Sequence, residues 1–139
     1  MSRHHLFNPE GMTPPYGFSH GALADEGRTL HIAGQTGHHP DLDIDEGLVE
    51  QFAQACRAVS RVIEEAGGKP DDLVSLTIYT TEINSYRENL GPIGAAYREV
   101  FGRHFPPMAL IGVTELFDPR SVVELVGVAV VGPDRSQSG

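Results

Sequence analysis

The sequence predicts an α+β protein in which helices pack on one face of a mixed β-sheet. Three patterns lead to this prediction. Residues 48–66 carry apolar side chains at spacings of three and four, which is typical of an amphipathic helix. Residues 73–80 alternate between apolar and polar side chains, and residues 122–131 are apolar at both parities. The complete order of elements predicts a mixed sheet of about six strands with two helices on one face.

The N-terminal third predicts short strands separated by turns. His4–Phe7 fits an edge strand, and Gly17–Ala22 fits a second strand. Asp25–Gly27 has the composition of a hairpin turn and leads into a third strand, Thr29–Ala33. The glycine-rich segment Gly34–Gly37 is expected to end this strand in a loop.

The clearest helix spans Leu48–Ala66. Asp43 or Asp45 is expected to cap its start, and Gly67 with the glycine after it ends it. The only cysteine of the chain lies on its apolar face, so no intrachain disulfide is possible and a buried, unreactive thiol is expected. The apolar stripe consists of Val49, Phe52, Cys56, Val59 and Ile63.

The C-terminal half predicts a second helix followed by two strands. The helix covers about Pro92–Phe101, and Gly102 is a natural stop for it. The strands are Met108–Val113 and Val122–Val131, with a turn at Phe117–Arg120 between them. The last strand is apolar on both sides, but no remaining segment could cover its second side. We therefore expect a homo-oligomer whose sheets face each other.

Length, charge and composition limit the classes of partner. The 139 residues fit one domain, 1–139, in which residues 133–139 form a polar tail that is expected to fray. The net charge of −9 argues against nucleic acid as the main partner. The sequence has neither the apolar core of a signal peptide nor an apolar run long enough to span a membrane. A small-molecule ligand and a cytoplasmic location are expected.

The histidines do not follow the spacing of a metal site. His38 and His39 precede an acidic stretch, but adjacent side chains diverge, so a solvated loop is expected rather than a metal. His4 and His5 are expected to be exposed. His104 is expected to end a helix, where a cation is favourable.

Two polar residues have readings that the sequence leaves open. His20 lies among small residues next to Ser19, and either a structural or a catalytic role fits it. Glu124 is the one charge in the last apolar strand, where an ionised carboxylate needs a partner. Glu124 either pairs with a nearby arginine such as Arg120 or lies at a solvent-facing strand start, or it is a pocket carboxylate that activates water.

Several motifs between Asn8 and Val131 occur in an order that resembles a known family. They are Asn8-Pro9-Glu10-Gly11, Ser19 after an aromatic residue, Ala33-Gly34-Gln35, Glu64-Glu65-Ala66-Gly67-Gly68, Tyr97, His104-Phe105-Pro106 and Glu124. Together they resemble the Rid family (YjgF/YER057c/UK114), and in particular its RidA branch. The resemblance implies a chorismate-mutase-like fold and a homotrimer with clefts between subunits. It also implies hydrolysis of enamines and imines such as 2-aminoacrylate, without a metal or organic cofactor.

The sequence departs from the RidA pattern at the residues that grip the substrate. The arginine that holds the substrate carboxylate in that branch is Met108 here. The cleft tyrosine is Phe18, the strand-end serine is Ala33, and an asparagine on the second helix is Gly94. A thioether cannot replace the bidentate bonds of a guanidinium.

Gln35 and Glu124 keep the identity that the family pattern predicts, and Ser19 lies beside the changed tyrosine position. The cleft is therefore expected to persist without its usual anion grip. Whether Arg103 or Arg120 of a neighbouring subunit replaces that grip is left open by the sequence.

These patterns give a leading hypothesis and two alternatives. The leading hypothesis is a homotrimer that hydrolyses an imine, an enamine or a related electrophile, with Glu124 orienting water and His20 donating a proton. The substrate-binding residues would be Phe18, Ser19, Gln35, Met108 and Ala109. A member that binds a metabolite or protein without catalysis is the first alternative. A ribonuclease or translation inhibitor is the second, and the acidic net charge disfavours it.

Overall fold

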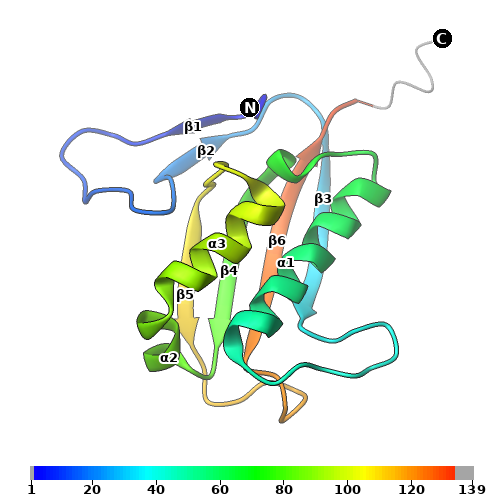
Figure 1. The fold of residues 1–139 in the computed structure, drawn as a ribbon. Coiled ribbons are helices and arrows are strands. Elements are labelled where there is room, and N and C mark those ends of the chain that lie inside the picture. The colour runs from blue at the N-terminus through cyan, green and yellow to red at the C-terminus, as the bar shows by residue number, and fades with distance from the viewer. Residues whose placement is uncertain (1, 134–139) are drawn as a thin grey trace.

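The four long strands form one mixed sheet. The structure, a computed structural model, describes residues 2–133. β3 (Arg28–Thr36), β4 (Leu73–Thr80), β5 (Met108–Gly112) and β6 (Val123–Val131) lie in the order β3-β6-β4-β5 (Figure 1). β6 is antiparallel to both of its neighbours, whereas β5 runs parallel to β4 at one edge. This arrangement confirms the α+β class.

The two N-terminal strands form a separate antiparallel pair. β1 (His5–Phe7) and β2 (Gly21–Leu23) lie beside the main sheet and extend past it (Figure 1). The described residues thus contain the six expected strands, divided into sheets of four and two. β2 begins later than predicted because a turn occupies residues 16–18.

The helices pack on one face of the four-stranded sheet (Figure 1). α1 (Leu48–Glu65) and α3 (Leu90–Phe101) match the predicted helices, and a short helix α2 (Ile83–Glu88) precedes α3. Apart from Val49, which is partly buried, the predicted stripe of α1 is buried. Burial raises the pKa of the Cys56 thiol to about 12. The thiol is therefore a packing group, as expected. None of the helices in residues 2–133 is long and apolar enough to cross a membrane.

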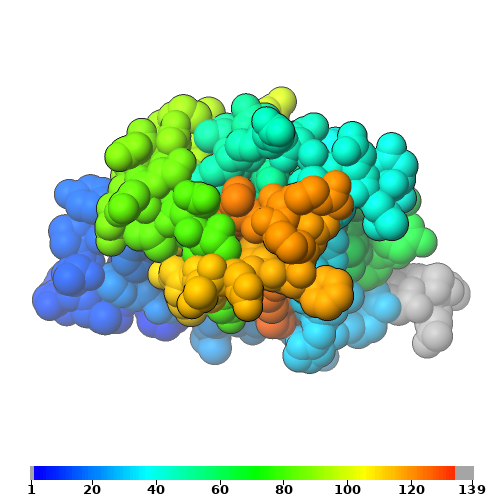
Figure 2. Space-filling view, turned by 90° about the horizontal axis from the view of Figure 1, so that it is seen from below, coloured from blue at the N-terminus to red at the C-terminus, as the bar shows by residue number. Residues whose placement is uncertain are grey.

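The two faces of β6 differ in burial. Val123, Leu125 and Ala129 face the helices and are completely buried. Val126 and Val128 point the other way and are only partly buried. Figure 2 shows the helices as one layer on the sheet, with the N-terminal segment (blue) extending to the side. No helix of the described residues covers the second face.

Two local predictions were wrong. The cap of α1 is Gly47, at φ 98°, and neither predicted aspartate, Asp43 or Asp45, caps the helix. The glycine-rich segment does not end β3, because a bulge lets the strand continue to Thr36. Apart from Pro133, the predicted frayed tail lies outside the described residues.

Candidate functional site

A groove of about 640 Å³ lies between α3, edge strand β5 and the turn before β2. Three of the predicted substrate-binding residues line it: Phe18, Met108 and Ala109. Much of the remaining lining is aromatic, from Tyr16, Phe52, Tyr86, Tyr97 and Phe105. The volume and the apolar lining are typical of a site for a small organic molecule.

Ser19 does not line the groove but connects two segments that do. Its side chain is buried, and its hydroxyl donates a hydrogen bond of 2.7 Å to the carbonyl oxygen of Phe105. The Ser19 N–H donates to the Pro106 carbonyl at 3.4 Å. These bonds hold the Phe18 side of the groove against the loop before β5, where Phe105 stacks on Tyr97 with ring centroids 5.6 Å apart. Within one chain, therefore, the proton of the Ser19 hydroxyl is used in a bond to the backbone and not in a bond to a ligand.

His20 lies behind Phe18 and is held by the N-terminal segment. Its ring meets the ring of Phe18 edge to face, with centroids 5.1 Å apart. Nε2 lies 2.8 Å from the Thr13 carbonyl and donates to it, which leaves Nδ1 as the acceptor nitrogen. The His20 N–H donates to the side chain of Asn8 at 2.8 Å, so the predicted Asn8–Gly11 turn anchors this segment.

Arg98 is the only charged residue among the described residues that line the groove. It lies on α3, one helical turn after Gly94, which also lines the groove. Sequence reasoning missed Arg98. The signal was the glycine four residues before it, since positions four apart share a helix face.

Glu124 lies on the face of the sheet that no helix covers. In register it is opposite Thr36 on β3 and Tyr79 on β4. A Cβ atom added to Gly34 would come within 2.8 Å of Cδ and 3.0 Å of Oε2 of Glu124, so the carboxylate lies directly over the Gly34 backbone.

Arg120 does not pair with Glu124. Its guanidinium lies 2.8 Å from Oδ2 of Asp118, and hydrogen bonds from Arg120 hold the pKa of the Asp118 carboxyl well below its usual range. Within residues 2–133, no cation lies within ion-pair distance of Glu124. Of the three readings that the sequence left open, pairing with Arg120 is therefore removed.

Gln35 is one position from the β3 residue that pairs with Glu124, but its side chain lies on the other face of the sheet. It follows the bulge of β3 and lies opposite Leu125, on the helix-covered side. Its amide donates to the Ala33 carbonyl at 3.1 Å. Thr36, rather than Gln35, shares the open face with Glu124.

The groove and the Glu124 carboxylate do not form one site within a chain. Tyr79 pairs with both Glu124 and Ile111, and Ile111 is three residues beyond Met108. Glu124 and Met108 are therefore two strand spacings apart across the sheet and three residues apart along it, a separation of about 14 Å. Met108 also pairs with the buried Leu76, on the face opposite to Glu124.

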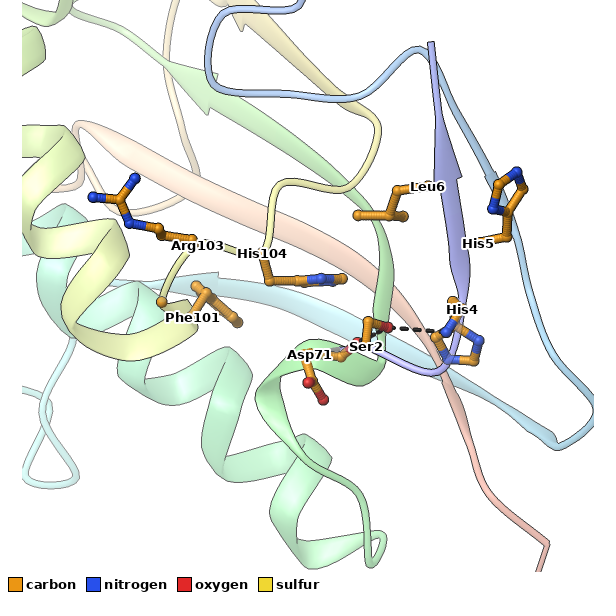
Figure 3. A pocket seen from close by; sticks show the side chains of 9 residues that line it. Ser2, His4, His5, Leu6, Asp71, Phe101, Arg103 and His104 are labelled. Carbon is orange, nitrogen blue, oxygen red and sulfur yellow. Dashed lines mark hydrogen bonds between the residues drawn. The ribbon is translucent and has the colours of Figure 1, made fainter.

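A second hollow of about 590 Å³ lies near the N-terminus, at the end of α3 (Figure 3). His4 and His104 line it, and both are buried. The prediction of an exposed His4 was wrong, because its Nε2 bonds the Val130 carbonyl at 2.8 Å and its Nδ1 accepts the Asp25 N–H. Arg103 also lines this hollow and not the groove, and its side chain points away from the His104 ring (Figure 3).

His104 differs from the helix-ending cation that was predicted. The Nε2 atom of its ring donates a hydrogen bond of 2.7 Å to the Leu73 carbonyl. Its backbone carbonyl accepts a hydrogen bond from the Tyr97 hydroxyl. Burial lowers the pKa of His104, so the neutral ring is favoured. The imidazole connects the loop before β5 to the start of β4.

The histidines before α1 bind carboxylates in the loops. Nε2 of His38 lies 2.8 Å from Asp118, and Nε2 of His39 lies 3.1 Å from Asp45. In the part of the chain that the structure describes, no cluster of histidine, cysteine and acidic side chains could hold a metal ion.

Comparisons with known proteins give the family. The family model described as endoribonuclease L-PSP matches residues 11–131. A RutC family protein of Aquifex aeolicus is 32% identical over 107 residues, which cover 71% of this chain and 79% of the relative. The 2-iminobutanoate/2-iminopropanoate deaminase of Homo sapiens is 29% identical over 126 residues, covering 88% and 85%.

Solved structures agree with this assignment. A Rid family protein of unknown function from Yersinia pestis, YyfB, has a TM-score of 0.82 and 32% sequence identity. The alignment covers 92% of this chain and 98% of that protein. The resemblance seen in the sequence is therefore confirmed, and this chain belongs to the Rid (YjgF) family, the one that the endoribonuclease L-PSP model describes.

Proposed function

We propose that the chain forms a homotrimer and hydrolyses an imine or enamine in clefts between its subunits. One observation carries this proposal. The groove beside Met108 and the carboxylate of Glu124 lie on opposite faces of the sheet of one chain. A site that uses both needs a second copy, whose open sheet face would bring its Glu124 to the groove of the first.

The chemistry needs only water and proton transfer. Water adds through oxygen to the carbon of the C=N bond while Glu124 accepts a proton from it. The nitrogen takes up two protons in turn, which balance the proton that water gives on addition and the hydroxyl proton that is lost as the C–N bond breaks. The products are ammonia and a carbonyl compound. An enamine first takes a proton on carbon and becomes the imine. His20, whose ring contacts Phe18, is the proposed proton donor to nitrogen. This role requires a proton on Nδ1, because Nε2 donates to the Thr13 carbonyl.

The substrate is proposed to be more apolar than 2-aminoacrylate. Met108 replaces the arginine that the RidA pattern has at this position, and Phe18 replaces a tyrosine. Both changes remove polar contacts from the groove and add apolar surface. An alkyl or aryl side chain would gain about 0.8 kcal/mol for each buried CH₂ group.

The test is ammonia release from imines generated in solution, with 2-aminoacrylate and more apolar imines as substrates. Glu124→Gln is expected to lower kcat by about 100-fold or more, the range for loss of a general base. Glu115→Gln, an exposed carboxylate in the loop after β5, is the control and should keep the wild-type rate. An undiminished rate in Glu124→Gln would refute the role of Glu124.

The non-catalytic alternative rests on Met108 itself. If the natural protein only binds a ligand, the wild-type chain releases no ammonia above the uncatalysed rate, while Met108→Arg gains activity on 2-aminoacrylate. RNA cleavage by highly purified protein that a groove substitution abolishes would favour the ribonuclease alternative.

A further inference from the structure

We propose that Arg98 is the anion-binding residue of the groove, and that the ligand is a monocarboxylate with a branched or aromatic body. This inference rests on the proposed function in one respect, namely that the groove binds the substrate. Ligand binding by Arg98 does not itself require hydrolysis.

Gly94 allows the Arg98 side chain to reach the groove. Helical side chains lean toward the helix N-terminus, so Arg98 extends back over position 94. A Cβ atom at Gly94 would lie 3.0 Å from Nη1 of Arg98, which places the guanidinium against the bare backbone of α3. Both residues line the groove, opposite the edge strand that carries Met108.

The guanidinium of Arg98 is available for a ligand. In residues 2–133, it forms no hydrogen bond or ion pair with protein groups within bonding distance. The other helical arginines are engaged: Arg57 with Gln54, Arg61 with Glu65 and Arg87 with Asn84. Arg98 therefore presents an unpaired fork of donors to the groove.

The chemistry of the lining selects the ligand. A carboxylate matches the planar guanidinium with two parallel hydrogen bonds. A dianion such as a phosphate would need more donors, and Arg98 is the only cation among the described lining residues. Phe18, Phe105 and Met108 offer apolar surface for the rest of the ligand, and methionine adapts to varied shapes. In this assignment the positive charge of the groove lies on α3, whereas the RidA pattern has it at the position of Met108.

Calorimetry with phenylpyruvate and with the 2-keto acid of leucine tests this assignment without turnover. Arg98→Gln is expected to weaken binding about 10- to 100-fold, the range for loss of a charged hydrogen bond. Arg98→Lys should recover part of the affinity. The control is Arg57→Gln, which removes an exposed helical arginine away from the groove and should bind like wild type.

Two further comparisons separate a ligand contact from a structural role. The primary amide of each keto acid should bind wild type and Arg98→Gln equally weakly. Gly94→Ala keeps the charge but displaces the guanidinium, and a severalfold loss of affinity is expected. The urea midpoint of Arg98→Gln should equal that of wild type.

The inference is overturned if wild type binds neither keto acid at millimolar concentration, or binds acid and amide equally. It is also overturned if Arg98→Gln has unchanged affinity, or if phenyl phosphate binds more tightly than phenylpyruvate. Binding that depends on Arg98 without any ammonia release would overturn the proposed hydrolysis and leave this inference standing. Ammonia release that is unchanged in Arg98→Gln would overturn the role of Arg98 and leave the proposed hydrolysis standing.

Discussion

At the scale of single residues, the missing side chain at position 34 sets the place of the Glu124 carboxylate. In Gly34→Ala the new methyl group would meet the end of the Glu124 side chain, which is flexible and can move. We expect kcat for imine hydrolysis to fall about 10-fold or more, since small displacements of a catalytic group are costly. The free energy of unfolding should change by less than about 1 kcal/mol.

The control for this substitution is Gly91→Ala, because a Cβ atom at Gly91 would meet nothing within 4 Å. Its kcat should equal that of wild type. If Gly34→Ala kept full activity, the position of the carboxylate over Gly34 would have no catalytic meaning.

His104 gives a second residue-level prediction, for the pH dependence of stability. Burial lowers its pKa in the folded state, so the unfolded chain binds more protons once the pH falls below about 6.5. Three neighbouring groups have smaller effects than burial on the charged His104 ring: His4 disfavours it, whereas Asp71 and Asp72 favour it. The urea midpoint should therefore fall as the pH is lowered from above 7 to about 5.

In His104→Gln, the urea midpoint should be lower at pH above 7, because the bond to the Leu73 carbonyl is lost or weakened. Its decrease toward pH 5 should be smaller than in wild type, since one group that protonates on unfolding is gone. Parallel pH profiles for the two proteins would contradict the assignment.

At the scale of elements, Ser19 joins the turn before β2 to the loop before β5. Ser19→Ala leaves the Phe105 carbonyl without its donor, and we expect a loss of about 1–2 kcal/mol in the free energy of unfolding. Since both segments line the groove, keto-acid affinity should fall as well. Thr114→Ala, in the exposed loop after β5, serves as the comparison and should affect neither quantity by a similar amount.

The regular elements were predictable because their periodicity is long enough to recognise. The eight residues of β4 alternate and the 18 residues of α1 carry a full stripe, so both were predicted within one residue at each end. The three-residue strands β1 and β2 carry no usable period, and α2 is short and mostly polar. Gly34 indicates a loop by composition, yet it belongs to a bulge within β3.

The candidate site was predictable only in part, for a related reason. Glu124 stood out because a lone charge in an apolar strand demands an explanation, and Met108 because of its place in a motif. Arg98 looks like any exposed helical arginine until the groove beside Gly94 is known. The burial of His4 depends on a carbonyl 126 residues away in the chain, which no local pattern reveals.

At the scale of the whole molecule, one face of the sheet carries apolar side chains that no helix of the described residues covers. Its valines are partly exposed, and the catalytic carboxylate proposed for the site lies among them. Edge strand β5 is also exposed, with Leu110 and Ile111 at 40% and 42%. Assembly of copies through this face would bury the apolar surface and complete the site together.

Substitution in the centre of this face tests the assembly. Val128 lies opposite His31 and Ser75, and in Val128→Lys the charge would be solvated in a monomer but buried between copies. Light scattering should give three times the monomer mass for wild type and the monomer mass for Val128→Lys, with an unchanged far-UV circular dichroism spectrum. Ammonia release should be lost with the assembly, whereas Ala95→Lys, on the exposed side of α3, should keep both. A wild-type protein that is monomeric and active would refute the shared cleft, because Glu124 and the groove lie on opposite faces of each sheet.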